Sequence, residues 1–302
     1  MTDMTTDSSP DESLSSWLRL REPVDHASRS VRVLEAALAA VARLSTGAPS
    51  VRVLDLATGA GSNLRYLIER LPATQEWLVV DRSPVLLRHL LERTAAWGEA
   101  RGYQAALGDG HLWLSGPTLQ CDIRTCERDL TTLDGDQLFE GRHLVTASAL
   151  LDLVSVSWLR NLAGRCRDAG AAALFTITYD GRTTSSPEEP EDALVLELFN
   201  RHQHTDKGLD GDAAGPDSAE AARRAFADAG FETCTDTSDW VLDADHPALQ
   251  RELIAGWAHA AIEMDPEQAD VISPWLTRRL VHVNAASSRV RVGHQDLAAW
   301  LR

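Results

Sequence analysis

The chain has 302 residues, of which 44% are hydrophobic, and its formal net charge is −16. This length suits one large domain with a substantial core, and the acidic balance disfavours nucleic acid and anionic membranes as partners. No apolar run approaches the roughly 20 residues that span a membrane. The four cysteines show neither a CxxC pair nor metal-ligand spacing, which favours a reduced, cytoplasmic protein without a metal site.

The N-terminal part is predicted to contain a tail followed by helices. Residues 1–16 are polar and acidic, lack the apolar core of a signal peptide, and are expected to form a disordered tail. Residues 17–48 carry leucine, alanine and valine at helical spacing, which predicts a helical cap ahead of the first strand.

Strand and helix patterns alternate from residue 51 to residue 180. The predicted strands cover 51–56, 76–81, 121–128, 143–148 and 172–179, and the predicted helices between them cover 62–71, 84–98 and 155–169. Ser83 and Pro84 form a helix-start signal, with serine as N-cap and proline at the first helical position. The alternation predicts an α/β fold with a parallel sheet.

The pattern changes beyond residue 180, where longer helical segments interrupt the strands. Helices are predicted over 193–204, 217–230, 247–263 and 266–285, strands over 233–242 and 289–293, and a short helix at the C-terminus. Residues 17–302 are expected to form a single domain. Within it, 51–180 would form the cofactor-binding core, and 181–230 and 245–287 would be helical insertions on the substrate side.

The most informative stretch runs from Asp55 through Gly59 and Gly61 to Asn63, between a hydrophobic strand and a helix. The third glycine of a dinucleotide fingerprint is missing, and no Gly-Lys-Ser/Thr follows, which excludes a phosphate-binding P-loop. An acid before such a loop suits a cofactor without phosphate that carries positive charge. S-adenosylmethionine, with its ammonium and sulfonium groups, has this chemistry.

The stretch resembles motif I of the class I S-adenosylmethionine-dependent methyltransferases, Asp/Glu-x-Gly-x-Gly-x-Gly, with Ala57 in place of the first glycine. The resemblance implies a Rossmann-like, seven-stranded, mostly parallel sheet whose last strand is antiparallel. It also implies that Asp81 binds the ribose hydroxyls and that Asp129 meets the adenine. The residues expected to bind S-adenosylmethionine are Arg29, Asp55, Ala57, Gly59, Gly61, Asn63, Asp81, Arg82, Asp129, Leu130 and Ser148.

The sequence gives fewer signals for the residues that would bind the substrate and act on it. Tyr179 ends the fifth predicted strand, at the sheet edge where open α/β sheets bind ligands. His202 and His204 lie in an unusually polar helix end, and a histidine there can remove a proton from a substrate hydroxyl or amine. These three residues are the catalytic candidates. For the two histidines the alternative is a surface helix terminus, where cationic side chains favour the C-terminal end of the helix dipole.

These patterns predict methyl transfer from S-adenosylmethionine to an O, N or C atom of a small molecule by in-line displacement. Two alternatives stay open at this point. The first is a non-catalytic, regulatory S-adenosylmethionine-binding module on the same fold. The second is an NAD(P)-dependent oxidoreductase, which the missing third glycine disfavours. The sequence does not indicate the acceptor or the oligomeric state.

Overall fold

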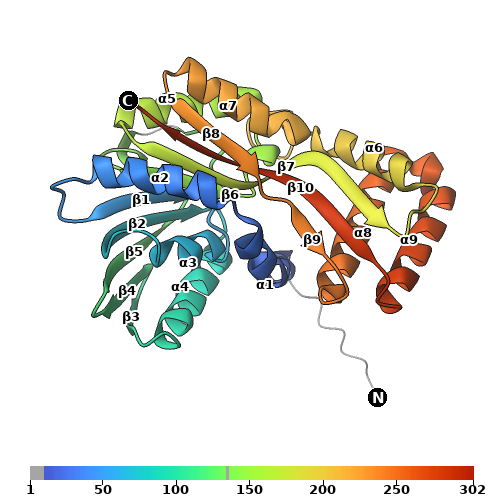
Figure 1. Ribbon diagram of the computed structural model, residues 1–302, viewed down its shortest axis with the longest axis horizontal. Coiled ribbons are helices and arrows are strands. Elements are labelled where there is room, and N and C mark those ends of the chain that lie inside the picture. The colour runs from blue at the N-terminus through green and yellow to red at the C-terminus, as the bar shows by residue number, and fades with distance from the viewer. Residues whose placement is uncertain (1–9, 134–135) are drawn as a thin grey trace.

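The computed structural model describes residues 10–133 and 136–302, and over these residues it forms one ten-stranded sheet with helices on both faces (Figure 1). Five strands run parallel in the order β5-β2-β1-β6-β7. Their bounds are β1 Val51–Leu56, β2 Thr74–Asp81, β5 Leu119–Glu127, β6 Leu144–Ser148 and β7 Ala172–Ser186. The final strand, β10 (Arg289–Trp300), lies antiparallel between β7 and β8 (Glu232–Thr237). The predicted α/β fold class is confirmed.

Three further strands enlarge the sheet beyond the seven predicted. A hairpin of β3 (Gln104–Gly108) and β4 (His111–Gly116) extends it antiparallel to β5. This hairpin was not predicted, although its two-residue turn, Asp109-Gly110, is a strong hairpin signal in the sequence. The segment predicted as one strand over 233–242 divides into β8 and β9 (Trp240–Leu242), and β9 also pairs with β10.

The short C-terminal helix was predicted wrongly, because β10 continues to Trp300. Successive residues of its second half face opposite layers of the molecule. Leu297 and Ala299 enter the core on one face of the sheet, and Ala298 enters the core on the other. This period of two is that of a strand buried on both faces.

Two apolar cores lie on the two faces of the sheet. One face is covered by α2 (Val31–Leu44), α3 (Ser62–Ile68) and α4 (Pro84–Glu99), and the other by α5 (Val156–Ala169) and α7 (Ser218–Asp228). The alternation along β1 explains the division, since Val53 packs into the first core and Leu54 into the second. Helix α7 therefore packs on the sheet as part of this layer, although residues 181–230 were predicted to form an insertion.

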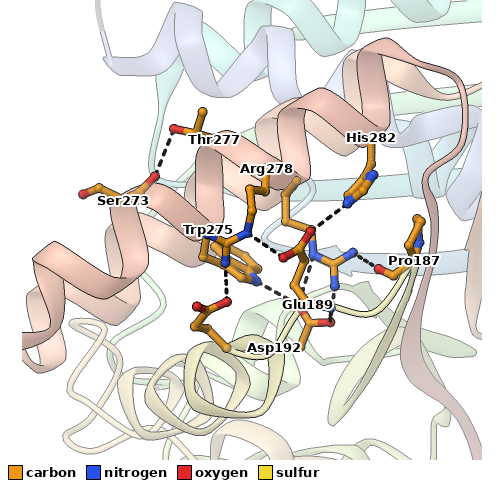
Figure 2. Close-up of polar contacts among 10 residues, drawn as sticks. Pro187, Glu189, Asp192, Ser273, Trp275, Thr277, Arg278 and His282 are labelled. Atoms are coloured by element: carbon orange, nitrogen blue, oxygen red, sulfur yellow. Dashed lines mark hydrogen bonds and ion pairs between the residues drawn. The ribbon is translucent and has the colours of Figure 1, made fainter.

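The long strands β7 and β10 run on past the rest of the sheet and carry a third core. This core contains α6 (Asp192–Gln203), α8 (Pro247–Met264) and α9 (Ala269–Asn284), which pack around Trp240, Trp257 and Trp275. Figure 2 shows how α9 is attached to the segment between β7 and α6. The fully buried Arg279 pairs with Asp192, whose Oδ1 also accepts a hydrogen bond from Trp275 Nε1 at 2.8 Å.

Helix α1 (Pro10–Ser28) lies against α3, α4, α8 and β9 (Figure 1). The predicted tail over 1–16 is therefore too long, because α1 already begins at Pro10; residues 1–9 lie outside the described part. Among the helices of the described ranges, none combines the length and apolarity needed to cross a bilayer.

Candidate active site

A cavity of about 270 Å³ opens at the carboxyl ends of the parallel strands. Strand β1 has β2 on one side and β6 on the other, so the order of the strands reverses direction at β1. Open α/β sheets bind their ligands in the crevice at such a switch point. The cavity is bounded by the loop after β1, the ends of β2, β5 and β6, and helix α1 above them.

The loop after β1 has left-handed backbone at three positions. Ala57, Gly59 and Gly61 have φ values of 48°, 54° and 83°. A Cβ atom on Gly61 would lie 2.7 Å from Leu90 Cγ, so glycine is required there by both backbone conformation and space. Ala57 adopts the same left-handed conformation, so alanine can stand where the motif has its first glycine.

Asp55 connects the end of strand β1 to this loop through side-chain hydrogen bonds. Its fully buried carboxylate accepts hydrogen bonds from Thr58 Oγ1 at 2.6 Å and Asn63 Nδ2 at 2.7 Å. Burial raises the pKa of Asp55 to about 6, although both hydrogen bonds act in the opposite sense. The carboxylate thus ties the end of β1 to the start of α3.

Asp81 is held in place by two backbone groups. Its Oδ2 accepts from the Gly59 N–H at 2.8 Å, and its Oδ1 accepts from the Ser83 N–H at 3.0 Å. A carboxylate has about four acceptor positions, so capacity for ligand hydroxyls remains on both oxygens. Asp129, at the end of the neighbouring β5 segment, is exposed, and its hydrogen bonds from Thr131 hold its pKa below the usual range.

Helix α1 forms the roof of the cavity with the face that carries Asp11, Leu14, Leu18, Arg21, Glu22 and Asp25. Glu22 anchors the roof: it accepts hydrogen bonds from Arg65 Nε and Nη2, both at 2.7 Å, and from Arg93 Nη2 at 2.7 Å. A second anchor joins Asp11 to Ser83, the N-cap of α4, at 2.8 Å. The roof is therefore attached to both α3 and α4.

Every predicted cofactor residue except Arg29 and Gly61 lines the cavity. Arg29 lies buried behind the loop, where its Nη1 donates to Asn63 Oδ1 at 2.8 Å and its guanidinium stacks 4.2 Å from the Tyr66 ring. Its Nη2 lies 3.4 Å from Ser148 Oγ. Arg29 thus supports cavity residues from behind.

The three catalytic candidates do not meet at the cavity. Tyr179 lies in the third core, where its hydroxyl donates to Asn200 Oδ1 at 2.7 Å and burial raises its pKa. His202 and His204 are also absent from the cavity lining, and His204 lies 3.8 Å from Asp217 with 45% of its side chain exposed. Within the described residues, no group of three or more His, Cys, Asp or Glu side chains is arranged to hold a metal.

Several cavity residues were not identified from the sequence. Arg21, Asp25 and the other roof residues recur at helical spacing from residue 11 to residue 25, and this periodicity was an available signal. Lys207 also lines the cavity, from a loop more than 140 residues distant from Asp55 in the chain. No local pattern marks it, apart from its being the only lysine of the protein.

No protein-family model and no curated protein matches the chain. Among solved structures, a cyclopropane synthase from Mycobacterium tuberculosis shares 15% identity, with 97% of this chain and 95% of that one covered and a TM-score of 0.45. A phosphoethanolamine N-methyltransferase from Haemonchus contortus shares 14%, with coverages of 95% and 58% and a TM-score of 0.41. A geranyl diphosphate methyltransferase shares 12%, with coverages of 89% and 85% and a TM-score of 0.39. At these values the likeness assigns no activity to this chain.

Proposed function

We propose that this protein binds S-adenosylmethionine in the switch-point cavity and transfers its methyl group to an O, N or C atom of a small molecule. The observation that carries the proposal is the placement of Asp81. Its carboxylate lies at the end of β2, is oriented by Gly59 and Ser83, and keeps acceptor capacity towards the cavity. A vicinal diol, such as that of a ribose, supplies the two donors that this arrangement accepts.

The polar groups around the glycine loop fit this cofactor. Asp55, Asp81 and Asn63 border the cavity, and this acidic surrounding suits a cationic ligand that lacks phosphate. A nicotinamide dinucleotide would bring its pyrophosphate against these carboxylates, and like charges at such distances repel. The acidic lining therefore favours S-adenosylmethionine over NAD(H).

The cofactor would supply an electrophilic methyl group on its sulfonium, so the main tasks of the protein are alignment and exclusion of water. Asp81 would hold the ribose, and Asp129 with the buried Leu130 would hold the adenine. The network of Arg29, Asn63 and Asp55 would keep the loop rigid beneath them. Leucines of the roof and of the loop after β6 would shield the reacting atoms; they are Leu14, Leu18, Leu150 and Leu153.

The modest volume of the cavity and the net charge of −16 both favour a small acceptor over a nucleic acid or a membrane lipid surface. The free cysteines are buried or half-buried, which is compatible with the reducing cytoplasm that we propose as its location.

Calorimetry with S-adenosylmethionine, S-adenosylhomocysteine and NADH tests the cofactor assignment. We expect the first two to bind and NADH not to bind. Binding of NADH alone would overturn the proposal. Release of S-adenosylhomocysteine on addition of candidate acceptors then distinguishes an enzyme from a regulatory module that only binds the cofactor.

A further inference from the structure

Lys207 connects the cavity with a histidine that lies outside it. The Lys207 side chain lines the cavity, and its Nζ donates to the His202 carbonyl oxygen at 2.8 Å and to Thr205 Oγ1 at 3.0 Å. The same nitrogen lies 3.3 Å from His202 Nδ1. Since an ammonium group is only a donor, His202 Nδ1 accepts in this contact and the ring carries its proton on Nε2.

The second ring nitrogen of His202 faces a different helix. His202 Nε2 lies 3.3 Å from Glu263 Oε2, near the end of α8. The Glu263 side chain is 53% exposed, and its other oxygen lies 3.5 Å from His259 Nε2. Lys207, His202 and Glu263 therefore form a continuous row of proton-carrying groups from the cavity wall to the surface.

A methyl acceptor that attacks through O–H or N–H must lose a proton as it is methylated. We propose that Lys207, His202 and Glu263 form a relay that carries this proton from the cavity to solvent. The relay rests on the proposed methyl transfer, and it gives Lys207 the role of proton acceptor at the cavity.

The transfers balance without a further reagent. Before reaction, the Lys207 ammonium passes a proton to His202 Nδ1, while His202 Nε2 passes its proton to Glu263, which releases it to water. The neutral Lys207 amine then takes the proton of the acceptor as the acceptor–methyl bond forms and the methyl–sulfur bond breaks. This proton restores the Lys207 ammonium. The partly exposed His202 ring then returns to its first tautomer by giving the Nδ1 proton to water and taking one from water at Nε2, so the net result is one proton passed from the acceptor to solvent.

Burial of Lys207 and His202 favours release of their protons. Burial lowers the pKa of Lys207, which the carboxylates of Glu263 and Asp152 oppose. Burial, followed by the Lys207 charge, lowers the pKa of His202, with Glu263 opposing and His259 contributing in the same sense as Lys207. Both groups thus surrender a proton more readily than they would in water.

Because Lys207 is the only lysine, its ionisation can be measured directly. Nitrogen NMR of protein labelled at lysine Nζ would give its pKa with no cofactor present. We expect Glu263→Gln to lower the pKa of Lys207 further, since a nearby carboxylate that raises it is removed. His246→Gln serves as the control, because His246 pairs with Asp243 at 3.0 Å on the surface and does not line the cavity. An unchanged Lys207 pKa in Glu263→Gln would overturn the relay.

The rate of methyl transfer gives the second readout. His202→Gln should lower kcat at least about tenfold, as loss of a proton acceptor does, with KM and cofactor affinity unchanged. The control His246→Gln should keep the wild-type rate. A wild-type kcat in His202→Gln, with cofactor binding intact, overturns the relay and leaves the proposed function standing. Failure of the wild-type protein to bind S-adenosylmethionine would instead overturn both.

Discussion

The Asp296 carboxylate accepts the backbone N–H of Ile177 at 2.8 Å through Oδ1 and that of Ser30 at 2.9 Å through Oδ2. Ile177 has a φ of 56°, which is rare for a β-branched residue, and it lies opposite the irregularity in β10 between Gln295 and Leu297. Ser30 is the N-cap of α2. One buried carboxylate thus supports an irregular point of β7 and the start of a helix.

Asp296→Ala should lower the free energy of unfolding by about 3 kcal/mol, because two buried N–H groups lose their acceptor. Urea unfolding measures the loss. Asp236→Ala is the matched control: Asp236 accepts from the Ser30 hydroxyl at 2.8 Å but is half-exposed, so its loss should cost less than about 1 kcal/mol. Equal losses in the two variants would show that the buried backbone groups are not the cause.

Asp81→Ala should weaken S-adenosylmethionine binding at least tenfold, about 1.4 kcal/mol, through the loss of two hydrogen bonds to the ribose. Titration calorimetry on folded protein measures this. Glu127→Ala is the control, since Glu127 pairs in register with Asp81 on the next strand but does not line the cavity. Unchanged affinity in a folded Asp81→Ala protein would remove Asp81 from the site.

Gly61→Ala should destabilise the protein by about 2–4 kcal/mol, since strain from a φ of 83° adds to the contact with Leu90. Gly102→Ala isolates the contribution of backbone strain. Gly102 has a φ of 84°, but a Cβ there would meet nothing within 4 Å. Thermal and urea unfolding of the two variants should show a smaller loss at Gly102. Similar losses of stability in the two variants would show that contact with Leu90 does not restrict position 61.

Asp55 should make the protein less stable as pH rises from about 4 to 6. Its pKa in the folded protein is about 6 against an ordinary value of 3.8, so the folded state holds this proton to higher pH than the unfolded state. Ionisation costs at most about 3 kcal/mol above pH 6, and protonation below pH 4 removes the cost. Asp152, also raised to about 6, acts in the same sense.

Urea unfolding at pH 4.5 and pH 7 measures this dependence. Asp55→Asn should reduce the difference in stability between the two pH values, while Asp122→Asn, on an ion-paired residue at the sheet face, should leave it in place. An equal difference in wild type and Asp55→Asn would show that Asp55 is not the group concerned.

The elements that sequence predicts well are those whose determinants are local. β1 was predicted with its exact bounds, and α4 within one residue, because Ser83 and Pro84 mark its start. The second half of β10 was missed, since polar residues such as His294 and Asp296 interrupt its apolar pattern. Their burial depends on partners from distant segments, which a periodicity within the strand cannot show.

The residues of the candidate site likewise divide into those with local sequence signals and those that depend on distant segments. The loop from Asp55 to Asn63 and the acid at Asp81 can be recognised because their spacing lies within one strand–helix–strand unit. Asp25 and Lys207 reach the cavity from segments far apart in the chain, so only tertiary folding brings them together. His202 illustrates the limit: its chemistry drew attention in the sequence, but its position relative to Lys207 and Glu263 required the structure.

The attachment of the roof has a consequence for the order of assembly. Helix α1 is synthesised before the rest of the described chain, but the arginines that hold Glu22 follow it by 43 and 71 residues. It can therefore gain these contacts only after α3 and α4 have been synthesised. The helix that covers the glycine loop thus depends on segments that are synthesised after it.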